Sequence, residues 1–123
     1  MATYKVFEEL EIWELARQLS LDIYEKTLKG TFSRDFALRD QINRSTGSVM
    51  DNIAEGFERD GRKEFIQFLG YSKGSTGEVR SQLYRPFDRK HLSQSEFDDL
   101  SSRKLNLGKQ IGGFMNYLKQ SQY

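Results

Sequence analysis

The polar side chains that could carry chemistry in this 123-residue sequence are few, and they lack the spacing that catalysis requires. His91 is the only histidine and cysteine is absent, so neither a histidine pair for zinc nor a thiolate nucleophile can form. We interpret His91, which follows Lys90 in an expected turn, as a solvated loop residue. Acidic residues crowd the starts of two expected helices, where the helix dipole already favours them. The sequence therefore predicts no catalytic residue, no metal site and no cofactor, and it identifies no small-molecule substrate.

A second set of polar residues lies beside small residues of the expected helices. Polar groups that are buried near such close contacts must find hydrogen-bond partners. We therefore predict a structural network of ion pairs and amides, with a ligand pocket as the alternative. Its expected members are Arg44, Asn52, Glu55, Arg59 and Glu78.

Basic and aromatic residues recur between positions 80 and 90 at a spacing that can place cations on phosphates and a ring against a base. The chain has 19 basic and 18 acidic residues and a formal net charge of +1, so attraction to RNA or DNA must come from a local patch. The alternative is a solvated helix face whose cations pair with nearby acids. The nucleic-acid contacts that we predict are Arg80, Tyr84, Arg85, Arg89 and Lys90, continued by Arg103, Lys104 and Lys109.

Four helices are expected to position these residues. Proline occurs once, and apolar residues recur at steps of three and four without sustained alternation, which indicates helices rather than strands. We expect helices over residues 7–29, 34–57, 61–83 and 93–119. Short connections reverse the chain each time, so the sequence predicts an all-α, antiparallel up-and-down four-helix bundle with a single domain over residues 1–123.

Several residues indicate where these helices begin and end. Ser93 and Glu96 fit a capping box, and we expect Ser33 and Asp60 to cap the second and third helices. Pro86 lacks a backbone donor, so the third helix either kinks there or ends and restarts within a few residues.

Glycine is unusually frequent in the third helix. Gly70, Gly74 and Gly77 lie within eight residues, and each weakens a helix interior. Close approach of another backbone is the simplest compensation. We therefore expect the second and third helices to pack tightly through these glycines together with Ser45, Ser48 and Asn52.

The first helix has more apolar surface than one neighbouring helix needs. We expect Trp13 and Tyr24 to join subunits or to receive a protein partner. No stretch approaches the ~20 apolar residues that span a bilayer, and no basic segment precedes an apolar run at the N-terminus. We expect a cytoplasmic protein without a membrane partner.

Three segments in the middle of the chain resemble a known family. They are Leu38-Arg39-Asp40-Gln41-Ile42-Asn43-Arg44-Ser45, Ser48-Val49-Met50-Asp51-Asn52-Ile53-Ala54-Glu55-Gly56 and Lys63-Glu64-Phe65-Ile66-Gln67-Phe68-Leu69, followed by Gly74-Ser75 and Glu78. The opening Leu10-Glu11-Ile12-Trp13 and Ala16 fit the same pattern. The chain resembles the bacterial four-helix-bundle proteins encoded in intervening sequences of 23S ribosomal RNA genes, and the Asn-Ile-Ala-Glu-Gly segment is the most specific match.

This resemblance implies a bundle that assembles into a homopentameric ring. It also implies kinship with the accessory variability proteins of diversity-generating retroelements, which are basic pentameric bundles that bind nucleic acid and a reverse transcriptase. No catalytic residues are established for the family. We therefore expect a non-enzymatic homo-oligomer that binds RNA or DNA through a basic face. The alternative is a protein-interaction scaffold without nucleic-acid binding.

Overall fold

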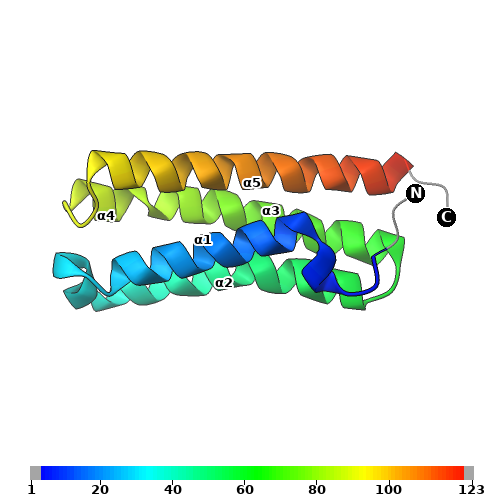
Figure 1. Cartoon of the computed structure of the whole chain (residues 1–123), viewed down its shortest axis with the longest axis horizontal. Helices are drawn as coiled ribbons and strands as arrows, with labels where there is room; N and C mark the ends of the chain where they lie inside the picture. The colour runs from blue at the N-terminus through cyan, green and yellow to red at the C-terminus, as the bar shows by residue number, and fades with distance from the viewer. Residues whose placement is uncertain (1–3, 121–123) are drawn as a thin grey trace.

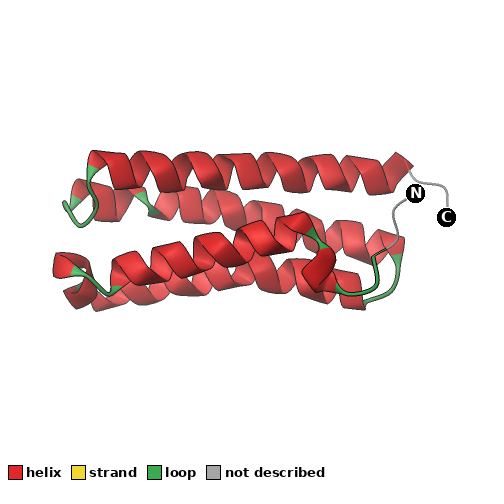
Figure 2. Cartoon of the chain, in the orientation of Figure 1, coloured by secondary structure: helices red, strands yellow, loops and turns green. Residues whose placement is uncertain are grey.

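The computed structural model describes residues 4–120, and over that range it consists of helices and their connections, without a β-strand. Successive long helices run in opposite directions, as Figure 1 shows, and the connections between them are short (Figure 2). This arrangement confirms the predicted all-α, antiparallel four-helix bundle. The long helices are α1 (Glu11–Thr27), α2 (Phe36–Glu58), α3 (Arg62–Gln82) and α5 (Gln94–Gln120). The short ones are η1 (Phe7–Glu9), η2 (Gly30–Arg34) and α4 (Tyr84–Asp88).

The bundle interior is filled by the apolar residues that recur at steps of three and four along each helix. On α1 the predicted stripe of Ile12, Ala16, Leu19 and Ile23 is buried throughout, and Ile42 of α2 is completely enclosed. Burial of each large aliphatic side chain contributes about 1.5–3 kcal/mol to folding. Among residues 4–120, no helix has both the length and the apolar composition needed to cross a membrane.

Helices α2 and α3 form the most extensively packed pair, and small residues bring them together. The hydroxyl of Ser72 on α3 donates to the main-chain oxygen of Val49 on α2 across 2.7 Å. At Gly56 a Cβ would lie only 2.6 Å from the Cβ of Phe68, so no larger residue fits without a shift of the backbone. Close packing of these two helices was predicted, but the glycine at the contact is Gly56 of α2 rather than the glycines of α3.

The prediction that the glycines of α3 make this contact is wrong. A Cβ added at Gly74 or Gly77 would meet no atom within 4 Å, and both residues are exposed. At Gly70 the nearest atom belongs to Met115 of α5. Packing against α2 therefore does not explain these glycines.

The start of α5 and the break near Pro86 follow the local sequence. The amide of Glu96 donates to Ser93 Oγ (3.1 Å), and the amide of Ser93 donates to Glu96 Oε1 (2.8 Å), which confirms the capping box. Helix α3 ends at Gln82, and Pro86 lies in the short α4 that follows. The helix therefore ends and restarts, because the proline ring would press on the carbonyl of Gln82.

Two predicted helix caps are wrong. Ser33 donates to the carbonyl of Gly30 within η2 (2.7 Å), and α2 begins only after Asp35. Asp60 has a positive φ of 59° in the turn after α2, and Gly61 precedes α3. Both polar side chains compete for local main-chain groups in turns, and the sequence does not decide which of these uses prevails.

Candidate functional site

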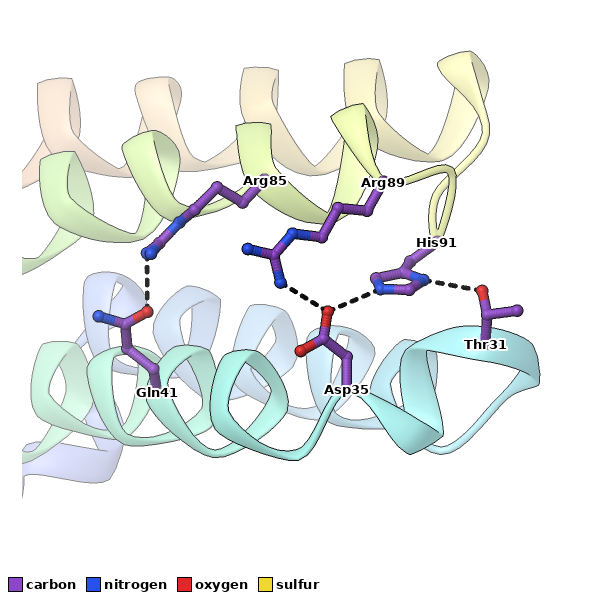
Figure 3. A network of polar contacts seen from close by, with 6 residues as sticks. All are labelled: Thr31, Asp35, Gln41, Arg85, Arg89 and His91. Carbon is purple, nitrogen blue, oxygen red and sulfur yellow. Dashed lines mark hydrogen bonds and ion pairs between the residues drawn. The ribbon is translucent and has the colours of Figure 1, made fainter.

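The predicted basic stripe is divided between two sides of the bundle. Figure 3 shows that Arg85 of α4 and Arg89, which directly follows α4, point towards α2 and the residue before it. Arg85 donates to Gln41 Oε1 (2.7 Å), and Arg89 pairs with Oδ2 of Asp35 (2.8 Å). Lys90 follows in a turn with a positive φ of 64°. Arg85 and Arg89 therefore already have partners within their own chain.

The other two residues of the stripe lie towards α5. The ring of Tyr84 packs edge-on against Phe97, with 4.9 Å between the centroids. Arg80 is exposed on α3 and lines a groove that this helix forms with α5. The structure therefore does not join the five predicted residues into one surface.

Asp35 is the centre of a cluster that fastens the turn after α4 to the start of α2. Its Oδ2 accepts from Arg89 and bonds to His91 Nε2 at 2.9 Å. The other ring nitrogen of His91 bonds to Thr31 Oγ1 across 2.7 Å (Figure 3). The ring also stacks on Phe32, with 5.3 Å between the centroids. These polar groups satisfy one another.

The interpretation of His91 as a solvated residue is therefore wrong, because only 10% of its side chain is exposed. The hydrogen bond from His91, and then that from Arg89, hold the pKa of Asp35 below its usual value. The order of hydroxyl, imidazole and carboxylate is also found in acyl-transfer sites. Here the carboxylate is also paired with an arginine, and the contacts tie the turn after α4 to the segment before α2.

The five residues of the predicted structural network do not come together either. Glu55 and Arg59 form an ion pair of 2.6 Å one turn apart on the exposed side of α2. The amide of Asn52 donates to the main-chain oxygen four residues earlier, across 2.8 Å. Arg44 and Glu78 are exposed. The network was predicted on the assumption of burial, and most of these side chains are not buried.

Of the two aromatic residues expected at an interface, only Tyr24 lies on an exposed apolar face. Trp13 is half-buried, and its ring packs on Phe7 with 5.0 Å between the centroids. Tyr24 is 49% exposed and lies beside Leu21 and Leu28, which are 51% and 53% exposed. We call these three residues the α1 apolar face.

A basic groove runs between α3 and α5, and sequence reasoning identified it only in part. It is open, with a volume of about 660 Å³, and five cations but no carboxylate line it. Such a lining suits an anion, and within the described part of the chain no group of His, Asp and Glu side chains could hold a metal ion. We call it the α3–α5 groove. Its lining residues are Lys73, Thr76, Gly77, Arg80, Lys104, Leu105, Gly108, Lys109, Gly112, Gly113, Met115, Asn116 and Lys119.

The cations of the α3–α5 groove are not engaged in ion pairs with the rest of residues 4–120. Lys104 differs from the other four because it is only 1% exposed and its Nζ has no hydrogen-bond partner. Burial, and then the neighbouring charge of Arg103, lower the pKa of Lys104 to about 8. Arg103 itself turns towards α1 and pairs with Asp22 (2.7 Å) and Asp99 (3.2 Å).

One signal in the sequence pointed to this groove. Lys104 stands in the apolar stripe of α5, at the helical spacing that Leu100, Leu107 and Ile111 also follow, and all four are buried. A lysine at such a position must either extend to the surface or find a partner. The exposed members Lys73 and Lys119 gave no comparable signal.

Comparison with known proteins establishes the family. Residues 8–113 match the model of the 23S rRNA-intervening sequence protein family. A crystal structure of a protein of unknown function from the S23 ribosomal protein family of Bacteroides thetaiotaomicron has the same fold, with a TM-score of 0.76 and 17% identity over 85% of this chain and 97% of that one. A search of curated proteins finds no match. The family match covers most of the chain, which therefore belongs to the 23S rRNA-intervening sequence protein family.

Proposed function

We propose that this chain is a non-enzymatic, self-associating four-helix bundle that binds RNA or DNA along the α3–α5 groove. The observation that carries the proposal is the concentration of five unpaired cations, without a carboxylate, on a chain whose net charge is only +1. Phosphates that bind such a site release condensed counterions, and this release drives most of the affinity of proteins for nucleic acids. The bulk charge of the chain cannot supply that attraction.

The proposal changes which residues contact the nucleic acid. Arg80 remains a contact because it lines the α3–α5 groove. Arg85 and Arg89 are no longer among the proposed contacts. The amide of Gln41 already accepts from Arg85, and the carboxylate of Asp35 accepts from Arg89. Lys104 and Lys109, which were predicted as a continuation of the basic stripe, are retained, and the added contacts are Lys73 and Lys119.

The shape of the α3–α5 groove favours a single strand over a duplex. Axes of packed helices lie about 8–10 Å apart, which is narrower than a double helix. No aromatic ring is among the groove's lining residues within positions 4–120, so stacking on bases is not provided. We expect recognition of the sugar–phosphate backbone with little dependence on sequence.

Self-association would place several copies of the α3–α5 groove, each a weak binding site, in one assembly. In a closed ring each subunit presents the same α3–α5 groove, and one strand that spans several subunits gains avidity. The α1 apolar face offers three half-exposed side chains for subunit contact. A pentamer is the state that the family resemblance implies, and we retain it as part of the proposal.

Salt-dependent binding tests the proposal. Affinity for a fluorescent single-stranded RNA is measured by anisotropy at 50–200 mM salt for three proteins. They are the wild type, the groove variant Lys73→Ala/Arg80→Ala/Lys109→Ala, and the control Lys29→Ala/Arg44→Ala/Lys63→Ala, which removes the same charge from exposed positions elsewhere.

Five phosphate contacts on a single strand give a slope of about −3.5 for log K against log salt concentration. The groove variant should lose about 2 units of that slope, and the control should lose little. Absence of salt-sensitive binding by the assembled wild type would overturn the proposal. Equal weakening of the groove variant and the control would do so as well.

The second candidate is a protein-interaction scaffold, and the α1 apolar face favours it. Leu21 and Tyr24 also border a groove of about 500 Å³ between α1 and α2. Light scattering of the double variant Leu21→Glu/Tyr24→Glu measures the contribution of this face to assembly. A monomeric variant that still binds RNA would separate the two functions, whereas an unchanged oligomer would exclude this face from subunit contact.

A further inference from the structure

Lys104 has a charged end that the folded chain leaves without a partner. Its side chain is 1% exposed, and its Nζ has no acceptor. Loss of hydration without a compensating contact is unfavourable for an ammonium group, which is why buried lysines are normally paired. The buried hydroxyls of Ser72 and Thr76 do pair with main-chain oxygens. Asn43 Oδ1 and Gln82 Oε1 are also buried without a partner, but among the three such side-chain atoms of residues 4–120 only Lys104 Nζ belongs to a charged group. The exception therefore requires an explanation.

Four glycines line the α3–α5 groove together with Lys104. Gly77 comes from α3, and Gly108, Gly112 and Gly113 come from α5. A Cβ at Gly77 or Gly113 would meet no atom within 4 Å, so packing inside the chain does not require glycine at these two positions. The missing side chains open a path for an incoming group to the part of the groove that Lys104 lines.

We propose that Lys104 is the inner phosphate ligand of the α3–α5 groove, and that a phosphodiester oxygen entering over the glycines draws its ammonium outwards into an ion pair. The inference rests on the proposed function and names the chemical group that this site selects. The four-carbon stem of a lysine allows such a movement without a change in the helix. Lys73, Arg80 and Lys109 hold the same strand from the exposed rim.

This assignment couples binding to the uptake of a proton. Without a ligand the pKa of Lys104 is about 8, and a phosphate beside the ammonium raises it. The charged groups around it are Arg103 and Lys109 on α5, Lys73 and Arg80 on α3, and Asp22 of α1, which pairs with Arg103. Affinity should therefore fall by up to about tenfold between pH 7 and pH 9 through Lys104.

The test compares Lys104→Met with Lys109→Met, which removes an exposed lysine of the same groove. Binding of a fluorescent oligouridylate of 12 nucleotides is measured at pH 7 and pH 9 at constant ionic strength. The wild type and Lys109→Met should both weaken by about tenfold between these pH values. Lys104→Met should bind about tenfold more weakly at pH 7 and lose that extra pH dependence.

Thermal melts accompany the binding curves and show that each variant is folded. Lys104→Met should melt at or above the wild-type temperature, because an apolar side chain replaces an unpaired cation. If Lys104→Met binds as the wild type does with the same pH dependence, the role of Lys104 is overturned while groove binding stands. If the wild type itself does not bind, both proposals fail.

Discussion

The Asp35 cluster and the α3–α5 groove use the same kinds of side chain in opposite ways. At Asp35 an arginine and a histidine converge on one carboxylate, and Thr31 satisfies the remaining ring nitrogen. In the α3–α5 groove five cations face no carboxylate, and Lys104 has no acceptor at all. Both regions join elements that are distant in the sequence. They differ in whether the charges are balanced within the chain.

That difference separates cations that stabilise the fold from cations that are available to a ligand. Density of basic residues is a poor guide, because the run of four basic residues between positions 80 and 90 contains Arg85 and Arg89, which are already engaged. Pairing is the better guide, and only the three-dimensional structure gives it. Substitutions in the Asp35 cluster and in the α3–α5 groove test the two regions separately.

The largest effect is expected at Lys104. A fall of its pKa from 10.5 to about 8 corresponds to about 3 kcal/mol against the charged form in the folded state. The unfolded chain binds the extra proton between these values, so wild-type stability should rise as the pH increases from about 8 to 10.5. In urea titrations Lys104→Met should be about 3 kcal/mol more stable at pH 7, and this advantage should shrink towards pH 10.5. A difference that does not change with pH would show that Lys104 is not an unbalanced charge.

Substitution of two glycines contrasts the tight contact between α2 and α3 with the open α3–α5 groove. Gly56→Ala should destabilise the protein by about 1–3 kcal/mol, because the new Cβ would lie 2.6 Å from the Cβ of Phe68. Gly77→Ala should stabilise it by about 0.5–1 kcal/mol, because the methyl group meets open space and alanine favours the helix. Chemical denaturation measures both. Destabilisation by Gly77→Ala would mean that this residue packs against something within the protein.

A smaller loss is expected when the Asp35 cluster is broken at His91. His91→Ala removes two hydrogen bonds and the stacking contact with Phe32, for a loss of about 1–2 kcal/mol. Exposed Lys109→Ala should change stability by less than about 0.5 kcal/mol. If both variants melt at the wild-type temperature, the Asp35 cluster is not a fastening.

The smallest effect is expected on the stability of the protein at acidic pH. Hydrogen bonds lower the pKa values of Asp35 and Glu96 from 3.8 and 4.5, so their contribution to stability is complete above about pH 4.5. It is lost as the pH falls through the lowered values. Asp35→Asn/Glu96→Gln should therefore reduce stability at pH 6 and flatten its decline between pH 5 and 3. A decline as steep as that of the wild type would assign acid sensitivity to other carboxylates.

The sequence predicted the fold well because helical periodicity is a local property. Ile42 and Ile23 follow stripes that any reader of the sequence can count, and Ser93 with Glu96 forms a cap from residues three apart. Ser33 and Asp60 had equally suitable side chains but other bonds or turns prevailed. A local pattern therefore predicts the presence of a helix more reliably than the residue at which the helix begins or ends.

The candidate site was predictable only where helical geometry alone decides it. At about 100° per residue, positions 80 and 85 would point to different sides of a continuous helix, so a division of the basic stripe was implicit in the sequence even before the break between α3 and α4. The ion pair between Arg89 and Asp35 joins residues 54 positions apart. The burial of Lys104 depends on helices other than its own. Those long-range contacts are the part that the sequence did not give.

Protection of lysines from acetylation tests most directly whether nucleic acid lies in the α3–α5 groove. The assembled protein is treated with an acetylating reagent at fixed concentration, with and without single-stranded RNA, and each lysine is quantified by mass spectrometry. Lys73, Lys109 and Lys119 should become protected, while exposed Lys29 and Lys63 should react as before. Binding that protects Lys29 and Lys63 but leaves the groove lysines reactive would contradict the account.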